Sequence, residues 1–115
     1  LESIKNLKVS SHFLITRKGA LIQFVPTYKR AWHAGISEYK GRKNCNDFSI
    51  GIELEGCDEE EFEKPQYYSL SRLINFLSID LQINKQNIVS HADIAPGRKT
   101  DPGPYFDWSL LQSML

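Results

Sequence analysis

Residues 48–55 read FSIGIELE, and this stretch predicts a β-strand with one apolar face. Its two isoleucines alternate with Gly51 and Glu53, and successive side chains of a strand point to opposite faces of the sheet. Glu53 is therefore expected on the face opposite the isoleucines. The strand places a carboxylate in the middle of an otherwise apolar segment.

A helix is predicted after this strand. Pro65 suits the first turn of a helix, where its missing N–H costs nothing. An apolar stripe with the spacing of one helical face follows the proline. Its members are Leu70, Leu73, Ile74, Leu77 and Leu81. A strand followed by an amphipathic helix predicts a helix packed against a sheet.

The first third of the chain predicts a hairpin and then a long loop. Residues 9–16 (VSSHFLIT) and 21–25 are rich in β-branched and aromatic residues, which favour strands. Between them Gly19 can supply the positive φ of a turn. Residues 27–46 show no periodicity and are interpreted as a long functional loop.

Towards the end of the chain, residues 88–90 predict a short strand that leads directly into His91. Asp107 can cap a last short helix that carries Leu110, Leu111 and Met114. The mixture of elements predicts an α/β (α+β) fold, a mixed central β-sheet flanked by helices. Residues 1–115 are long enough for one domain with a single core.

Composition excludes several classes of function. Fourteen basic and fourteen acidic residues give a net charge of zero, which predicts no nucleic-acid partner and no membrane partner. No apolar stretch approaches the roughly 20 residues of a membrane span. Residues 1–8 lack the apolar core of a signal peptide, so we expect a cytoplasmic monomer. Cys45 and Cys57 lack CxxC spacing and are expected to be reduced thiols.

Residues 91–108, HADIAPGRKTDPGPYFDW, carry the first group of candidate functional residues. Their prolines and glycines predict a shaped surface loop rather than a regular helix or strand. His91 and Asp101 offer two of the three protein ligands of a catalytic zinc site. Alone, such a pair is more often a surface histidine and a turn aspartate, but the proline and glycine density favours a site. Lys99 could stabilise an oxyanion beside the metal, or be a solvated surface lysine.

The candidate general base is a glutamate of the strand at residues 48–55. Glu53 has apolar neighbours in sequence, and a buried carboxylate must be paired, bind a metal or have a raised pKa. A raised pKa suits the base that takes a proton from water. Glu55 faces the same way, and spacing alone does not choose between the two.

Three further residues could take part. His12 lies in the middle of a predicted strand and is interpreted as a hydrogen-bonded core histidine. His33, in the long loop, could line the pocket. Trp32 beside it offers a flat face for a sugar ring, or a hydrophobic plug that closes the loop onto the core.

Together these motifs resemble the zinc-dependent N-acetylmuramoyl-L-alanine amidases, whose fold is shared with peptidoglycan recognition proteins and phage T7 lysozyme. The resemblance rests on VSSHFLI, GALIQFVP, KRAWHAG, CNDFSIGIELEG and HADIAPGRKTDPGP, which occur in this order along nearly the whole chain. CNDFSIGIELEG together with DIAPGRKTDPGPYFDW resembles the cytoplasmic branch that hydrolyses 1,6-anhydro-muramoyl-L-alanine amides in cell-wall recycling.

The resemblance implies a Zn²⁺ cofactor, a small muropeptide substrate and a role for each candidate. His91 and Asp101 match the second and third zinc ligands. Glu53, rather than Glu55, matches the catalytic glutamate, and Lys99 matches the lysine at the oxyanion. The residues expected to contact substrate are Trp32, His33 and Arg98, with Arg98 on the rim of the cleft. His12 and His33 match histidines that do not bind metal.

The family's first zinc ligand has no counterpart in these 115 residues. It is a histidine at the end of an early strand, in a VVHN-like motif. We therefore expect an amidase domain that is N-terminally truncated relative to the family. Two other interpretations stay open, namely a catalytically impaired domain that binds muropeptide without cleaving it, and a non-functional remnant.

Overall fold

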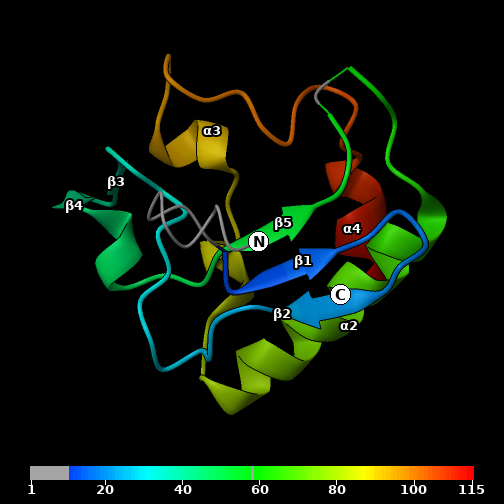
Figure 1. The fold of residues 1–115 in the computed structure, drawn as a ribbon, viewed down its shortest axis with the longest axis horizontal. Coiled ribbons are helices and arrows are strands. Elements are labelled where there is room, and N and C mark those ends of the chain that lie inside the picture. The colour runs from blue at the N-terminus through cyan, green and yellow to red at the C-terminus, as the bar shows by residue number, and fades with distance from the viewer. Residues whose placement is uncertain (1–10, 58) are drawn as a thin grey trace.

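The computed structural model describes residues 11–57 and 59–115, and a three-stranded mixed sheet lies at its centre (Figure 1). The strands are β1 (Phe13–Ile15), β2 (Leu21–Gln23) and β5 (Ile52–Leu54), in the spatial order β2-β1-β5. β1 pairs with β2 in an antiparallel hairpin and with β5 in parallel. The predicted mixed sheet is confirmed.

All three strands are shorter than the predicted ranges. Residues 9 and 10 of the first predicted strand lie outside the described residues. In the third, the strand pairing begins only at Ile52, because β1 offers three paired positions. The predicted turn at Gly19 is confirmed by its φ of +86°. A Cβ there would also lie 2.8 Å from the Pro65 carbonyl oxygen, so the turn touches the start of the next helix.

Two helices cover one face of the sheet. α2 (Lys64–Asp80) begins with Pro65 in its first turn, as predicted, and α4 (Trp108–Met114) packs beside it (Figure 1). Asp107 caps α4 by accepting a hydrogen bond from the Leu110 N–H, which confirms its predicted role. The shared core contains Phe13, Ile15, Tyr67, Leu70, Leu73, Ile74, Leu77, Phe106 and Leu111. Leu81 is the exception to the predicted stripe, because it ends the helix and is 37 % exposed.

Gln66 joins the start of α2 to the sheet. Its side-chain oxygen accepts a hydrogen bond from the Glu63 N–H, and its amide nitrogen donates to the carbonyl of Glu55 at 2.9 Å. The Gln66 side chain is fully buried, so these bonds satisfy polar groups that would otherwise be costly to bury. The helix is thereby anchored to the end of β5.

Three sequence predictions about local structure are wrong. The long loop at residues 27–46 contains a small antiparallel ladder, β3 (Glu38–Tyr39) with β4 (Arg42–Lys43), and the start of a 3-10 helix, η1 (Cys45–Asp47). Residues 88–90, which follow the 3-10 helix η2 (Lys85–Asn87), form no strand, because no described strand pairs with them.

The third correction concerns the loop that follows. Its first residues form a short helix, α3 (His91–Ile94), ahead of the prolines and glycines. Ser90 and Asp93 form a capping box, a local hydrogen-bond pattern that starts a helix. Among the helices in the described part of the chain, none combines the length and the apolar character that crossing a bilayer requires.

Candidate active site

His91 and Asp101 come together at the start of α3. The chain returns to the helix after the loop, and the Ala92 N–H donates to the Asp101 carbonyl at 3.1 Å. This backbone bond brings Asp101 Oδ2 within 3.2 Å of His91 Nδ1. The Asp101 side chain is half exposed and the His91 side chain is 18 % exposed, so the pair is accessible from solvent. The predicted convergence of the two residues is confirmed.

Both ring nitrogens of His91 face acceptor oxygens. When Nε2 carries the ring proton, it donates to the Ala34 carbonyl oxygen, which lies 2.9 Å away and can only accept. In a neutral ring Nδ1 is then an acceptor, and it faces a carboxylate oxygen that is also an acceptor. Two facing acceptors 3.2 Å apart need a proton or a cation between them. Two ligand atoms on one tetrahedral zinc ion are about 3.3 Å apart, given ordinary zinc bond lengths.

These two residues are the part of a metal site that the described residues supply. Within residues 11–57 and 59–115, no group of three or more His, Cys, Asp and Glu side chains is placed to hold a metal ion. His12 is engaged elsewhere, since its Nε2 lies 2.7 Å from the Lys29 carbonyl and its Nδ1 accepts from the Gly51 N–H. It is buried, which confirms the interpretation as a core histidine.

His33 is half-buried between His12 and the site. Its Nε2 lies 3.1 Å from the Ser49 hydroxyl. Burial, and then the neighbouring His12 and His91, lower the pKa of His33 to about 4, against a weaker opposing effect of the hydrogen bond with Ser49. Its ring packs on Gly51, where a Cβ would lie 2.5 Å from the ring carbon Cγ. This close approach explains why glycine occupies that strand position.

Glu53 is exposed, which corrects the prediction that it lies in a buried, apolar place. Its predicted orientation is right, because Ile52 and Leu54 pack against the core and Glu53 points to the other face. On that face its cross-strand neighbour is the half-buried Leu14, and solvent reaches the carboxylate. The flanking apolar residues therefore do not bury Glu53. Glu55, by contrast, accepts a hydrogen bond from the Arg17 N–H at 2.8 Å.

Lys99 and Arg98 follow α3 and differ in their surroundings. Lys99 is exposed, and its backbone N–H donates to the Ala95 carbonyl. The guanidinium of Arg98 donates to the carbonyl oxygens of Ala34 and Ile36, at 2.5 and 2.8 Å. Arg98 thus ties the segment after α3 to residues 34–36.

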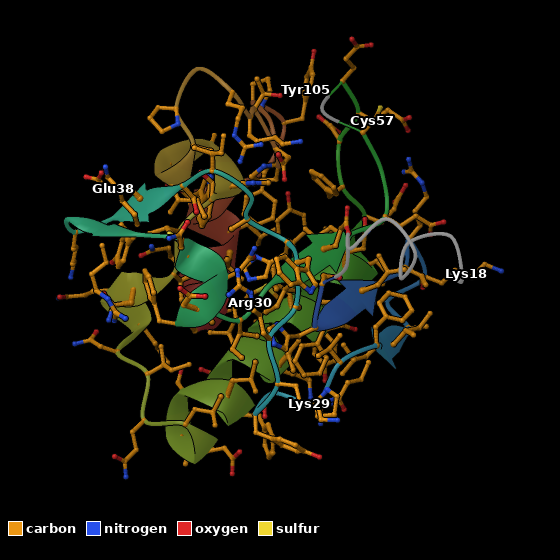
Figure 2. All side chains as sticks on the ribbon, turned by 60° about the vertical axis from the view of Figure 1, so that its left-hand side comes forward. Lys18, Lys29, Arg30, Glu38, Cys57 and Tyr105 are labelled. Atoms are coloured by element: carbon orange, nitrogen blue, oxygen red, sulfur yellow. The ribbon has the colours of Figure 1, made fainter. Side chains whose placement is uncertain are left out.

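Trp32 lies beside this segment and is 42 % exposed. The guanidinium of Arg30, which Figure 2 labels, lies over its ring, 4.2 Å from the centroid, and also pairs with Asp47 of η1. The ring is held in place by a cation–π contact, and a large part of it is open to solvent. The alternative of a buried plug does not describe this side chain.

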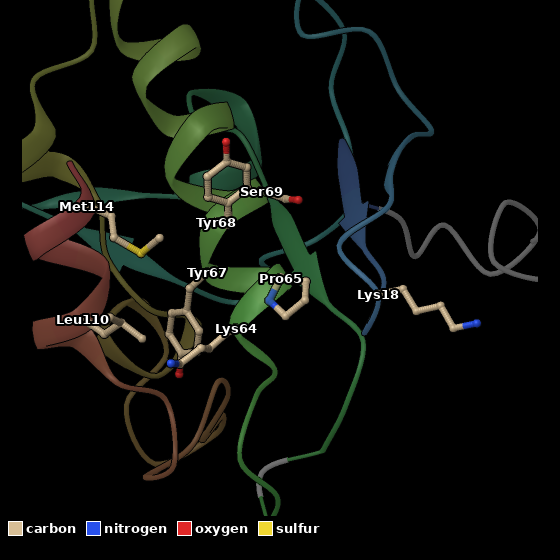
Figure 3. A pocket seen from close by; sticks show the side chains of 8 residues that line it. All are labelled: Lys18, Lys64, Pro65, Tyr67, Tyr68, Ser69, Leu110 and Met114. Atoms are coloured by element: carbon tan, nitrogen blue, oxygen red, sulfur yellow. The ribbon is translucent and has the colours of Figure 1, made fainter.

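A separate apolar pocket lies between the start of α2 and α4 (Figure 3). Its lining residues are Lys18, Lys64, Pro65, Tyr67, Tyr68, Ser69, Leu110 and Met114. None of the predicted site residues lines it.

Sequence reasoning missed the groups that hold the site together. The Ala34 carbonyl binds His91, and the buried Asn46 side chain binds the backbone of His33 and Ala34. A backbone carbonyl has no signature in a sequence. Asn46 falls within the CNDFSIGIELEG motif, but nothing in its spacing shows which backbone groups it contacts.

Known proteins share both the sequence and the fold of this chain. A family model described as N-acetylmuramoyl-L-alanine amidase matches residues 2–104. The 1,6-anhydro-N-acetylmuramyl-L-alanine amidase AmpD of Escherichia coli K12 is 53 % identical over 112 residues, which are 97 % of this chain and 61 % of that protein. The chain spans about 60 % of the length of the curated relatives it matches first.

Two solved structures extend the comparison. The crystal structure of a selenomethionine derivative of AmpD superposes with a TM-score of 0.93 at 49 % identity, covering 99 % of this chain and 64 % of that one. The E. coli amidase AmiD was solved in complex with anhydro-N-acetylmuramic acid-L-Ala-D-γ-Glu-L-Lys. It superposes with a TM-score of 0.88 at 39 % identity, covering 98 % of this chain and 51 % of that one. The amidase fold predicted from the sequence motifs is confirmed.

Proposed function

The chain belongs to the N-acetylmuramoyl-L-alanine amidase family, and from this we infer its function. We propose that it is the larger part of a zinc-dependent amidase. The bond hydrolysed joins the lactyl group of 1,6-anhydro-N-acetylmuramic acid to L-alanine of the stem peptide. The reaction releases the peptide during peptidoglycan recycling, and we place it in the cytoplasm, with the protein as a monomer.

The observation that carries the proposal is the pair of facing acceptors, His91 Nδ1 and Asp101 Oδ2, 3.2 Å apart. This separation fits one edge of a tetrahedral zinc site, and the Ala34 carbonyl supplies the outer hydrogen bond typical of a zinc-bound histidine. The family resemblance assigns the remaining ligand to a histidine that these 115 residues do not include. When bound, zinc would act as a Lewis acid on the amide carbonyl and lower the pKa of water.

Glu53 is the proposed general base. The exposed carboxylate can take a proton from the attacking water and pass it to the amine that leaves. Its exposure means that no internal partner among the described residues must be displaced first.

Lys99 is the proposed oxyanion residue. It is exposed and two positions before Asp101, so its ammonium can approach the carbonyl oxygen on which negative charge develops. Trp32 is proposed to stack on the sugar ring, because part of its face is open to solvent. His33 and Arg98 are proposed to border the substrate, with Arg98 at the rim. AmiD, a 39 % identical relative, binds an anhydro-muropeptide of this class.

The test uses the full-length natural polypeptide that contains this chain, purified and loaded with zinc. We expect it to release stem peptide from soluble anhydro-muropeptide faster than from intact sacculi. His91→Ala and Asp101→Ala should lose both bound zinc and turnover. Faster cleavage of sacculi would overturn the recycling assignment.

One further outcome would favour the second candidate function, muropeptide binding without cleavage. Tight binding of anhydro-muropeptide by a polypeptide that neither retains zinc nor releases peptide would establish it.

A further inference from the structure

The Ala34 carbonyl determines how His91 presents its ring. It lies 2.9 Å from Nε2, and a carbonyl oxygen only accepts hydrogen bonds. A proton on Nε2 donates to this carbonyl, and the lone pair of Nδ1 then faces Asp101, where a metal would bind. If this carbonyl moved or turned away, His91 would lose the acceptor for its Nε2–H.

Asn46 holds the backbone that carries this carbonyl. Its Oδ1 accepts hydrogen bonds from two consecutive N–H groups, His33 at 3.0 Å and Ala34 at 2.8 Å. Asn46 is 7 % exposed and lies in η1, where its neighbour Cys45 is also buried. A buried acceptor shared by two successive N–H groups fixes the peptide planes on either side of His33, and with them the position of the Ala34 Cα from which the carbonyl extends.

Arg98 contacts the Ala34 carbonyl directly. Its guanidinium donates to Ala34 O and Ile36 O, and Gly35 between them has a φ of +63°. A Cβ on Gly35 would lie 2.9 Å from the guanidinium, so the turn is packed closely on Arg98. Arg98 is exposed, whereas Asn46 is buried. The hydrogen bonds of Asn46 are therefore better shielded from water than those of Arg98.

We propose that Asn46 is a positioning residue for His91, acting through the Ala34 carbonyl. The inference rests on the proposed function in that it takes His91 as a zinc ligand. It adds a residue from a different segment of the chain, η1, which contacts neither the metal ligands nor, in this proposal, the substrate. Residues that orient a metal-bound histidine typically change metal affinity by roughly 10–100-fold when mutated.

The experiment compares Asn46→Leu with Asn46→Asp in the full-length polypeptide. Leucine keeps the approximate size and removes the acceptor, whereas aspartate keeps an oxygen acceptor for both N–H groups. Asn75→Leu is the matched control, because Asn75 Oδ1 is buried in α2 with no hydrogen-bond partner among the described groups. The first readout is the tautomer of His91 in metal-free protein at pH 8.5, from two-bond ¹⁵N–¹H correlations of the ring, measured in the Asp101→Ala background so that the carboxylate does not compete with Ala34 for the ring proton. The second is zinc affinity, by competition with a chromogenic chelator.

We expect wild type, Asn46→Asp and Asn75→Leu to keep the proton on Nε2 and to bind zinc within about threefold of one another. Asn46→Leu should show a mixture of tautomers and roughly 10–100-fold weaker zinc binding. Wild-type-like tautomer and zinc affinity in Asn46→Leu would overturn the proposal. A proton on Nδ1 in the Asp101→Ala background with Asn46 intact would overturn it as well, even if Asn46→Leu failed to fold.

Failure of the proposed function gives a different result. In that case His91→Ala would bind zinc as well as wild type does. The tautomer measurement, made without metal, would still decide whether Asn46 orients His91.

Discussion

The sheet side of the molecule and the site side are stabilised in different ways. β1, α2 and α4 bury a continuous cluster of large apolar side chains, among them Ile15 and Leu111. Around α3 the second buried cluster is small, formed by Ala34, Cys45 and Ile94. There polar side chains bind backbone groups instead.

This difference predicts two kinds of mutational effect. Hydrophobic burial has no directional requirement. Removing a core side chain should therefore lower the free energy of unfolding, through lost burial, without changing the geometry of the site. Hydrogen bonds are directional, so loss of a polar group in the site should change geometry and activity more than stability. The predictions below test this contrast, from the largest expected effect to the smallest.

Glu53→Gln should have the largest effect on activity. The amide keeps the shape but accepts no proton, so kcat for release of stem peptide should fall roughly 10²–10⁴-fold in the full-length protein. Zinc content should stay the same, and stability should change by less than about 0.5 kcal/mol, because Glu53 is exposed. Glu55→Gln is the matched control. Near-normal turnover of Glu53→Gln with a slow Glu55→Gln variant would assign the base to Glu55.

Ile15→Ala should have the largest effect on stability. Ile15 is 0 % exposed in β1, and removing such a side chain typically costs about 2–5 kcal/mol. Urea unfolding monitored by circular dichroism measures the change. Ile22→Ala on the neighbouring strand is the control, since Ile22 is 39 % exposed and should be affected much less. Equal losses for the two variants would contradict the assignment of the core to the helix-covered face.

Lys99→Ala should lower kcat roughly 10²–10³-fold and leave KM nearly unchanged. The reason is that the negative charge it would stabilise exists only in the transition state. Steady-state kinetics on soluble anhydro-muropeptide give both parameters, and Lys43→Ala, on the exposed strand β4, controls for loss of a positive charge. A raised KM with unchanged kcat would make Lys99 a substrate-binding residue.

Asp107→Ala should cost about 1 kcal/mol of stability, because it removes the cap of α4. Thermal or urea unfolding measures the loss, and Asp107→Asn should recover most of it. An unchanged stability in Asp107→Ala would show that packing of Leu111 alone holds α4 against the core.

The last prediction concerns His33 and pH, and its effect on stability at neutral pH is the smallest. Its pKa is lowered to about 4, chiefly by burial, whereas an unfolded histidine titrates near the ordinary value of 6.5. Between these values the unfolded state binds more protons, so stability rises with pH. The contribution of His33 is present above pH 6.5 and is lost as the pH falls towards 4. NMR titration of the ring should give the low value, and His33→Gln should flatten this part of the stability profile.

Local chemistry explains which parts of the fold were predictable from the sequence. The apolar stripe of α2, Pro65 in its first turn, the turn at Gly19 and the cap at Asp107 depend on near neighbours in the chain. The structure confirms each of them. The α/β class also followed from the alternation of strand and helix patterns. The prediction of a strand at residues 88–90 was wrong, because a strand forms only where another strand pairs with it.

The candidate site likewise has a part that the sequence indicates and a part that only the tertiary structure shows. The sequence by itself indicated His91 and Asp101, because the density of proline and glycine around them favours a site and the family resemblance matches both to zinc ligands. Only the tertiary structure placed their facing atoms 3.2 Å apart and showed Glu53 to be exposed. It also showed Asn46 and the Ala34 carbonyl holding His91. Burial and long-range hydrogen bonds depend on which distant segments meet, and residue spacing along one strand or loop contains no record of that.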